Sequence, residues 1–300
     1  MMSAAVELKR VSRSFGEDFS LGPLTLSVPQ GAIFALIGPN GAGKTSTLNL
    51  TIGAGRPQTG EIELLGLPFP AREADIKRRV GFVSPELDYS AWRTVGRAID
   101  FVRDFYPDWV HTRCERLQRL LEIHRTQRIA ELSFGQRTKL ALILALSREC
   151  ELLILDEPTI GLDPVSKRAI FVELLRFMEN ESHTILISSH QLGDVERIAD
   201  HVALLNDGKL LTASPIDELL ERYRVVEITN TNAHALPEQG VTVFEQRDAR
   251  ARALLDLHVT TPQLLRANGL DLISITALTL EELFLTLIRS DDARRPWRPY

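Results

Sequence analysis

The sequence is poor in several features that mark whole classes of proteins. It has two cysteines, Cys114 and Cys150, at a spacing that fits neither a disulfide framework nor a zinc site. Its longest conspicuous apolar stretch, residues 140–146, is far below the ~18 residues of a membrane-spanning helix. Residues 1–10 mix charged and polar side chains with short apolar pieces, unlike a signal peptide. These absences predict a protein of a reducing compartment that reaches a membrane only through a partner.

An excess of one charge is also lacking. The formal net charge is -5 over 300 residues, which gives no electrostatic footprint for duplex DNA or for an anionic membrane surface. We therefore predict no nucleic-acid partner. Hydrophobic residues make up 44% and charged residues 25%, an ordinary globular composition that excludes a disordered or fibrous chain. At this length, one large α/β core with a smaller appended domain is the expected division.

Short apolar runs separated by helical patterns predict a parallel sheet covered on both faces. These runs are 32–37, 80–83, 152–155 and 184–187. Alternating segments predict a small antiparallel layer at 6–8, 24–28 and 61–65. Helical periodicity predicts an insert of helices over about 90–148, one of which carries Ile99, Phe101, Val102 and Phe105 as its apolar positions. Asn206-Asp207-Gly208, between two short strands, predicts a hairpin.

A boundary is predicted near Ser214-Pro215, so that residues 1–215 form the main domain and 216–300 a small C-terminal α+β domain. The second domain has strand-like pieces at 224–229, 241–244 and 272–275. Two helices are predicted there. One begins at Thr261-Pro262, an N-cap followed by proline, and the other at Thr279 with a capping box to Glu282.

The clearest motif is a phosphate-binding loop, G-x-x-x-x-G-K-[ST], between a buried strand and a helix. Its residues are Gly38, Pro39, Asn40, Gly41, Ala42, Gly43, Lys44 and Thr45. The glycines let backbone amides turn toward phosphate oxygens, and the following helix points its positive end at the same anion. Lys44 is expected to reach the β- and γ-phosphates of ATP, and Thr45 to ligate Mg²⁺. The alternative is a glycine-rich turn that matches by accident.

Two acids end the apolar strand at 152–155, where ligands bind in open α/β sheets. Asp156 is predicted to support Mg²⁺, directly or through water. Glu157, on the other side of the strand end, is predicted to act as general base toward an attacking water. The alternative is a solvated acidic pair at a strand terminus.

A second anion site is predicted at the start of an apolar helix, in the segment Leu132-Ser133-Phe134-Gly135-Gln136. Ser133 and Gln136 have capping-box spacing, and Gly135 leaves the first turn open to close approach. A capped helix with a chance glycine is the alternative.

Together these motifs resemble the ATP-binding cassette (ABC) ATPase family. The first motif along the chain is GPNGAGKTS. It is followed by LSFGQ, which begins twenty residues before LLILDE. Gly161-Leu162-Asp163 is similar to the family's D-loop and Ser188-Ser189-His190 to its switch histidine. The resemblance covers roughly residues 5 to 215 and implies a P-loop NTPase (RecA-like) core with an antiparallel layer.

The resemblance implies a homodimer in which two cassettes pack head to tail. In that dimer, the γ-phosphate held on the partner's P-loop would be contacted by Ser133, Gly135 and Gln136. The contacts of each P-loop with its nucleotide would extend to Ser46. His190 would bond the γ-phosphate or the attacking water in its own subunit. Asp163 would act between subunits, with a local role as helix N-cap as the alternative. Phe15 resembles the aromatic residue that stacks on adenine, with ordinary packing as its alternative.

Within the family, Trp92-Arg93-Thr94-Val95 and the late Leu280-Glu281-Glu282-Leu283-Phe284 resemble ATPases of ABC-2 transporters, including bacitracin-resistance pumps. This implies a separate integral-membrane permease, an export function and a position on the cytoplasmic face of the cell membrane. Residues 89–93 and the next helix are the candidate docking site. The sequence departs from the family pattern at Pro85 or Glu86, near the position after the third strand where the family commonly carries Gln. The alternative function, a soluble ABC protein of DNA or ribosomes, usually shows a coiled-coil insertion, zinc cysteines or a duplicated cassette.

Overall fold

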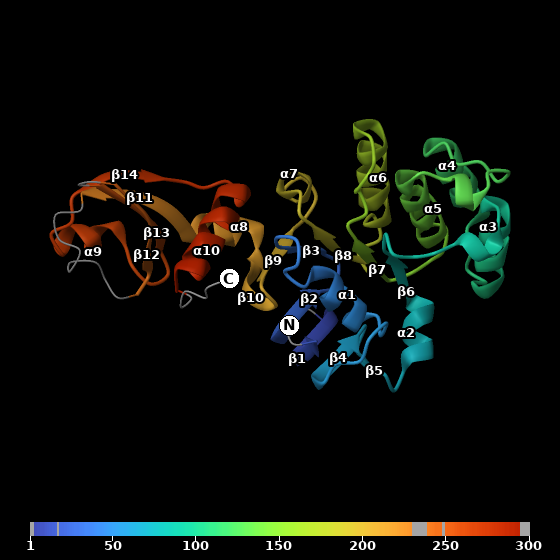
Figure 1. Cartoon of the computed structure of the whole chain (residues 1–300), viewed down its shortest axis with the longest axis horizontal. Helices are drawn as coiled ribbons and strands as arrows, with labels where there is room; N and C mark the ends of the chain where they lie inside the picture. Colours follow the sequence, from blue (N-terminus) through green and yellow to red (C-terminus); the bar gives the residue numbers. More distant parts are fainter. Residues whose placement is uncertain (1–2, 17, 230–238, 248–249, 295–300) are drawn as a thin grey trace. The chain divides into compact units, whose positions relative to one another are not determined.

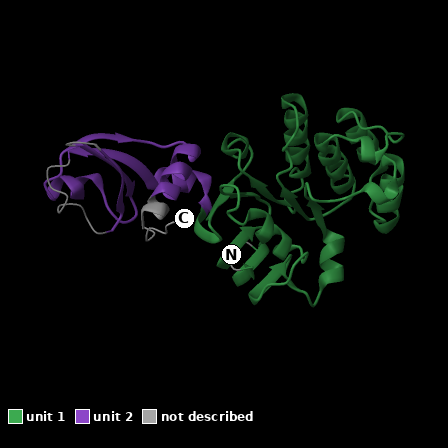
Figure 2. Ribbon diagram, in the orientation of Figure 1, with its two compact units in different colours: residues 1–213 green, residues 214–300 purple. Residues whose placement is uncertain are grey.

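The computed structural model describes residues 3–16, 18–229, 239–247 and 250–294 (Figure 1). The chain divides into two compact units, 1–213 and 214–300 (Figure 2). Within the described ranges, every helix is too short or too polar to span a lipid bilayer.

A six-stranded sheet organises the first unit. Its strand order is β10-β9-β3-β8-β7-β6, and the pairs from β9 to β6 are parallel. The strands are β3 (Ile33–Ile37), β6 (Val80–Val83), β7 (Leu152–Asp156), β8 (Thr184–Ser189), β9 (His201–Asn206) and β10 (Lys209–Pro215). Every residue of β3, β7 and β8 is buried. The uninterrupted apolar runs therefore mark strands covered on both faces, as predicted.

Four antiparallel strands form a second sheet in the order β2-β1-β4-β5. They are β1 (Ala4–Phe15), β2 (Phe19–Pro29), β4 (Thr59–Leu64) and β5 (Leu67–Phe69). One hydrophobic core joins this sheet, helix α1 (Lys44–Thr51) and one face of the parallel sheet, with Leu26, Leu48 and Ile154 among its members. The predicted antiparallel layer is present, and β1 and β2 extend well beyond the predicted segments.

Helices cover the other face of the parallel sheet, where Figure 1 shows α5 (Phe134–Leu146) and α6 (Pro164–Phe177). The helical insert comprises α3 (Val95–Phe105), α4 (His111–Leu120), α5 and the short turns η1 (Ser90–Trp92) and η2 (Ile129–Glu131). Two shorter helices, α2 (Glu73–Arg79) and α7 (Leu192–Val195), precede β6 and follow β8. The predicted hairpin joins β9 to β10, and its turn has positive φ at Asp207 (45°) and Gly208 (71°).

In its described residues, the second unit is a four-stranded antiparallel sheet, β12-β13-β11-β14, with three helices. Its elements are α8 (Ile216–Arg222), β11 (Tyr223–Thr229), β12 (Val241–Arg247), β13 (Arg250–Asp256), α9 (Pro262–Ala267), β14 (Leu272–Thr276) and α10 (Leu280–Arg294). Leu265 of α9 lies in the core formed by one face of this sheet. Thr261 caps α9, and Thr279 and Glu282 form the predicted capping box of α10.

The sequence patterns do not predict β13 or α8. In β13, arginine and alanine alternate at residues 250–253, and small side chains give a weak hydrophobic period. The strand forms because it pairs on both sides, with β11 and β12, so tertiary context supplies what the local pattern lacks.

Candidate functional site

The phosphate-binding loop connects buried β3 to the first turn of α1. Gly41 and Gly43 have φ of 79° and 101°, in the left-handed region that residues with a Cβ rarely adopt. Lys44 is 7% exposed, and its ammonium donates to the carbonyls of Gly38 (2.9 Å) and Pro39 (3.3 Å). The lysine is thus folded back over the loop, toward the space that backbone amides of such a loop enclose around a phosphate.

The other predicted loop residues surround this lysine. Gly38 and Ala42 are buried, Pro39, Thr45 and Ser46 are half-buried, and Asn40 and Gly41 are exposed. A Cβ on Gly38 would lie 2.4 Å from the carbonyl oxygen of Leu205, so the loop packs closely on β9. This packing fixes the position of the loop against β9.

Phe15 lies at the end of β1 and is 37% exposed. Its ring centroid is 5.9 Å from that of Phe19, and the Arg13 guanidinium lies over it at 5.0 Å. A Cβ on Gly43 would lie 3.0 Å from Cζ of Phe19, so the aromatic pair joins the phosphate-binding loop through Phe19. Phe15 therefore presents an accessible ring near the loop, and Phe19 is a contact that sequence patterns did not single out.

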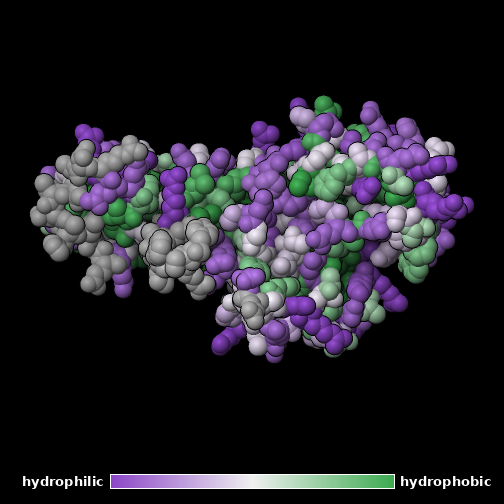
Figure 3. All heavy atoms as spheres, in the orientation of Figure 1, coloured by the Kyte–Doolittle hydropathy of each residue, from purple (hydrophilic) through white to green (hydrophobic). Residues whose placement is uncertain are grey.

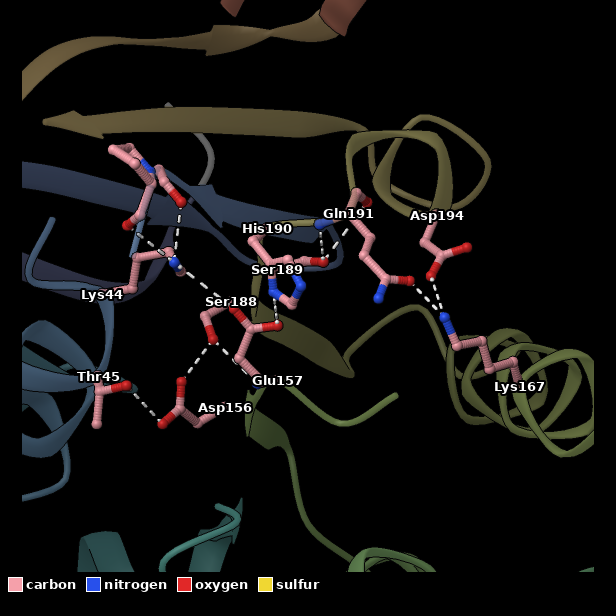
Figure 4. A network of polar contacts seen from close by, with 12 residues as sticks. Lys44, Thr45, Asp156, Glu157, Lys167, Ser188, Ser189, His190, Gln191 and Asp194 are labelled. Carbon is pink, nitrogen blue, oxygen red and sulfur yellow. Dashed lines mark hydrogen bonds and ion pairs between the residues drawn. The ribbon is translucent and has the colours of Figure 1, made fainter. Parts of the chain in front are cut away.

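Three polar side chains meet where α1, β7 and β8 come together (Figure 4). The Thr45 hydroxyl donates to Asp156 Oδ2 at 2.9 Å, and the Ser188 hydroxyl donates to Asp156 Oδ1 at 2.6 Å. Mg²⁺ prefers one or two protein oxygens with substrate phosphates and water completing its shell. The Thr45 hydroxyl and the Asp156 carboxylate fit that donor set beside the phosphate loop. No cluster of three or more acidic, histidine or cysteine ligands occurs in the described ranges.

The sequence patterns do not mark Ser188 as a site residue, although it lies in the triplet that resembles the switch-histidine segment of the family. It is fully buried, and its hydroxyl also accepts the backbone N–H of Glu157 at 3.0 Å. It therefore positions both acids at once. Only the parallel pairing of Asp156 with Ser188 on β7 and β8 brings them together, so the local sequence carried no signal for this contact.

Replacing Ser188 by alanine should destabilise the protein by about 1–3 kcal/mol, because a buried N–H and a carboxylate oxygen both lose a partner. The free energy of unfolding in urea measures this. Ser182→Ala removes an exposed hydroxyl that bonds to Asn180 and is the matched control, with an expected change within about 0.5 kcal/mol. Equal losses in the two variants would contradict the positioning role.

Glu157 lies between a lysine and a histidine (Figure 4). Its Oε2 is 2.8 Å from Nδ1 of His190, and its Oε1 is 3.5 Å from Nζ of Lys44. Glu157 has a φ of 47°, a strained conformation for a residue other than glycine, which turns it out of the line of β7. Its side chain is 14% exposed and that of His190 37%. The pair thus lies beside the phosphate loop, at a border with solvent, where a carboxylate can meet water.

The loop after His190 is fixed to helix α6. Lys167 of α6 donates to the side chain of Gln191 and lies 3.5 Å from Asp194, while the Gln191 N–H donates to the Ser189 hydroxyl (Figure 4). These contacts hold the backbone on both sides of His190. The imidazole is itself held by the 2.8 Å contact of its Nδ1 with Glu157 Oε2.

The segment at 132–136 forms the predicted capped helix start. The Gln136 N–H donates to the Ser133 hydroxyl (3.2 Å), and the Ser133 N–H donates to the Gln136 carboxamide (2.9 Å). A side chain at position 135 would also be excluded by packing, because a Cβ there would lie 2.4 Å from the Gly161 carbonyl oxygen. Ser133 is exposed. Within the described residues, no hydrogen bond or ion pair joins this segment to the phosphate-binding loop of the same chain.

Asp163 has the local role that proline at the next position predicts. Its carboxylate caps α6 by accepting the Ser166 N–H at 2.9 Å and the Ser166 hydroxyl at 2.5 Å. These hydrogen bonds lower the pKa of Asp163 to about 2. Lys139 lies 3.7 Å away. The side chain is still 56% exposed, which leaves room for a contact with another subunit.

Glu86 is exposed, and its backbone N–H donates to the hydroxyl of Ser84 at 3.2 Å. Its carboxylate forms no hydrogen bond or ion pair within the described part of the chain. The loop at Pro85 and Glu86 therefore does not join Thr45 and Asp156 in this arrangement.

A phosphate loop beside a magnesium-compatible acid and a histidine-paired glutamate fits an ATP-hydrolysing site, and comparisons with known proteins show which family the chain belongs to. The sequence profile of the family described as ABC transporter matches residues 21–160. The bacitracin transport ATP-binding protein BcrA of Bacillus licheniformis is 31% identical over 96% of this chain and 98% of its own length. The chain belongs to the ABC transporter family. This ABC protein is an ATPase that binds ATP.

Other matches agree with this assignment. The Nod factor export ATP-binding protein I of Cupriavidus metallidurans is 31% identical to this ABC ATPase over 84% of the chain and 86% of the relative. A solved structure of an ATP-binding subunit of an ABC transporter has a TM-score of 0.65 at 26% identity, covering 72% of this chain and 92% of that one. A dimeric ATP-binding cassette bound to ADP and Pi has a TM-score of 0.61 at 21% identity, over 70% and 98%, and shares the fold. The P-loop NTPase fold is therefore confirmed.

Proposed function

We propose that this ABC ATPase powers a separate integral-membrane permease of an exporter, from the cytoplasmic face of the cell membrane. The observation that carries the proposal is the match over nearly the whole chain to a bacitracin transport protein, together with a Nod factor export protein among the relatives. Both are named for transport, which favours this function over work on DNA or ribosomes. A net charge of -5 also gives no general attraction to nucleic acid.

The ATP site is proposed to be completed by a second copy of the chain. The capped start of α5 is exposed at Ser133 and Phe134, and within the described residues it has no hydrogen bond or ion pair with its own phosphate loop. A helix start of this kind can receive the γ-phosphate held by a partner. Ser133, Gly135 and Gln136 would make that contact in a head-to-tail homodimer. The exposed Asp163 carboxylate would face the same junction.

In the proposed reaction, the loop from Gly38 to Ser46 holds the triphosphate, with Lys44 on the β- and γ-phosphates and Phe15 against adenine. Mg²⁺, held by Thr45 and Asp156, would neutralise phosphate charge when bound. Glu157 accepts a proton from the attacking water as that water bonds to the γ-phosphorus and the bond to the bridging oxygen breaks, which leaves ADP and phosphate. His190 holds the Glu157 carboxylate in place through the 2.8 Å contact.

An aromatic row on the helical insert is the proposed contact with the permease. Tyr89, Trp92, Phe101 and Phe105 follow one another with ring centroids 5.9, 5.0 and 4.9 Å apart. Phe101 is 45% and Phe105 65% exposed, although both were predicted among the apolar positions of their helix. Figure 3 shows hydrophobic residues at the surface over the end of α3. Tyr89 and Trp92 are half-buried, so Phe101 and Phe105 form the exposed end of the row, and an exposed apolar surface of this kind marks an interaction site.

The test is to isolate the tagged chain from membranes in mild detergent. One integral-membrane protein should co-purify, and Trp92→Ala with Phe105→Ala should reduce its yield on the order of tenfold, since aromatic anchors dominate interfaces. Leu175→Ala, which truncates an exposed side chain of α6, is the control with unchanged yield. Recovery of ribosomes or DNA in place of a membrane protein would overturn the proposed function.

A further inference from the structure

An arginine two positions earlier in β1 covers one face of the Phe15 ring. The guanidinium carbon of Arg13 lies over the ring, 5.0 Å from its centroid. A cation in this place is attracted by the negative charge on the face of the π-system. Because the guanidinium occupies this face, an incoming base can stack only on the other face of the ring.

The guanidinium is held by the backbone of a neighbouring loop. Its Nη1 donates to the carbonyl oxygen of Arg56 at 3.1 Å. Within the described residues, Arg13 forms no ion pair with a carboxylate, so its described partners are a ring face and a neutral carbonyl. The positive charge of Arg13 is therefore directed at the Phe15 ring and is not neutralised by an acid.

Gly55 leaves the space that the guanidinium fills. A Cβ at position 55 would lie 2.4 Å from Nη1 of Arg13 and 3.4 Å from its Cζ. Gly55 is not among the glycines with positive φ, so its backbone conformation does not call for glycine. Room for the Arg13 side chain is thus the feature of the structure that a side chain at position 55 would disturb.

The end of β1 is fixed independently of the Arg13 side chain. The Ser14 N–H donates to Gln58 Oε1 at 2.9 Å, and the Gln58 N–H donates to the Ser12 carbonyl oxygen at 2.8 Å. The strand also pairs with β2 and β4 on its two sides. Loss of the guanidinium should therefore loosen the Phe15 ring without displacing the strand that carries it.

We propose that Arg13 is a positioning residue for the base of ATP, because it holds the Phe15 ring in the orientation that stacks on adenine. The inference rests on the proposed function and deepens it, since it assigns part of the ATP affinity to a side chain that does not touch the nucleotide. Phe15 is 37% exposed, and a ring free to turn would lose rotamer freedom on stacking. A ring already held by the guanidinium has less freedom to lose, and such preorganisation raises affinity.

The experiment compares two ligands on the full-length chain by isothermal titration: ATP with Mg²⁺, and inorganic tripolyphosphate with Mg²⁺. Tripolyphosphate has no base, so a change that concerns only the ring alters the binding of ATP alone. Arg13→Met removes the guanidinium and keeps an unbranched side chain, whereas Arg13→Lys keeps a cation. Gly55→Ala keeps Arg13 but displaces its guanidinium. Cooperative thermal unfolding of each variant verifies that it is folded.

Arg56→Met is the matched control. It removes an exposed guanidinium from the same loop and keeps the backbone carbonyl that accepts from Arg13. Any effect of lost positive charge on the phosphates should therefore appear in this variant as well, for both ligands.

Arg13→Met should bind ATP roughly two- to fivefold more weakly than the unchanged chain, as expected for the loss of an exposed cation–π contact. Gly55→Ala should change the affinity in the same direction, and Arg13→Lys should restore most of it. Arg56→Met should bind ATP as the unchanged chain does. Tripolyphosphate should bind all of these variants equally well, a result that general damage to the site would not give.

A double-mutant cycle with Phe15→Ala separates an effect through the ring from a direct contact of Arg13 with ATP. Phe15→Ala should itself weaken the binding of ATP and not that of tripolyphosphate. In that background Arg13→Met should cause no further loss, because the ring through which it acts is gone.

Unchanged ATP affinity in Arg13→Met, or equal losses for ATP and tripolyphosphate, would overturn the inference. A loss of the same size in the Phe15→Ala background would also overturn it, because Arg13 would then act without the ring. In these cases the weaker ATP binding of Phe15→Ala still supports the proposed adenine contact. If Phe15→Ala binds ATP as tightly as the unchanged chain, that proposed contact fails first and the inference fails with it.

Discussion

Glu157→Gln should bind ATP but lose hydrolysis by a factor of about 10²–10⁴, the usual contribution of a positioned general base. The substitution keeps the size of the side chain and an oxygen that can accept from His190, which lies 2.8 Å away in the unchanged chain. It removes the group that accepts the proton of the attacking water. With hydrolysis blocked, ATP should stay between two subunits, and the variant should accumulate as an ATP-bound dimer.

Phosphate release and analytical ultracentrifugation with saturating ATP and Mg²⁺ measure these two effects. Glu181→Gln, which changes an exposed acid before β8, is the control with unchanged hydrolysis. Monomeric behaviour of Glu157→Gln under these conditions would refute the two-subunit site. Full hydrolysis by the variant would refute the role of Glu157 as base.

Lys44→Ala should weaken ATP binding by about 2–3 kcal/mol, or roughly 30- to 150-fold, because a charge-assisted contact with the phosphates is lost. The lysine is preorganised for this contact. It is 7% exposed and already folded over the loop, 2.9 Å from the Gly38 carbonyl oxygen and 3.5 Å from Glu157. An incoming phosphate replaces neutral carbonyl acceptors by a charged one. Hydrolysis should fall further than binding, since charge on the γ-phosphate grows in the reaction.

Isothermal titration with ATP and Mg²⁺ measures the affinity, and phosphate release at saturating ATP measures turnover. Lys209→Ala removes an exposed lysine of β10 and should change neither quantity. If Lys44→Ala kept both affinity and turnover, the loop from Gly38 to Ser46 could not be the site of the triphosphate.

Local signals predicted much of the fold because their physics is local. The apolar runs that form β3, β7 and β8 are buried on both faces, so their composition alone marks them. The N-caps of helices are also predictable from the local sequence. Ser133, Asp163 and Thr279 each bond to a residue three positions along the chain, a distance fixed by the helix itself.

Other features depended on partners far away in the sequence. The exposure of Phe101 and Phe105 could not be predicted, because both lie at the edge of one broad apolar face of their helix, and only packing decides how much of that face is covered. The strand β13 forms between two neighbours and not from its own pattern. The contacts of Arg148, which follows α5, likewise depend on distant elements, because its Nη2 donates to the Val80 carbonyl oxygen and its guanidinium carbon lies 3.8 Å from the Tyr106 ring centroid.

By itself, the sequence determined which residues we propose for the chemistry of this ATPase: a glycine loop with Lys44 and Thr45, two acids at a strand end, and a capped glycine-bearing helix start. These follow from residue type and spacing over a few positions. The tertiary structure alone decided that Ser188 holds both acids, that His190 meets Glu157, and that Gly135 fits against Gly161. Parallel strands bring together residues more than thirty positions apart, and no local pattern records which of them become neighbours.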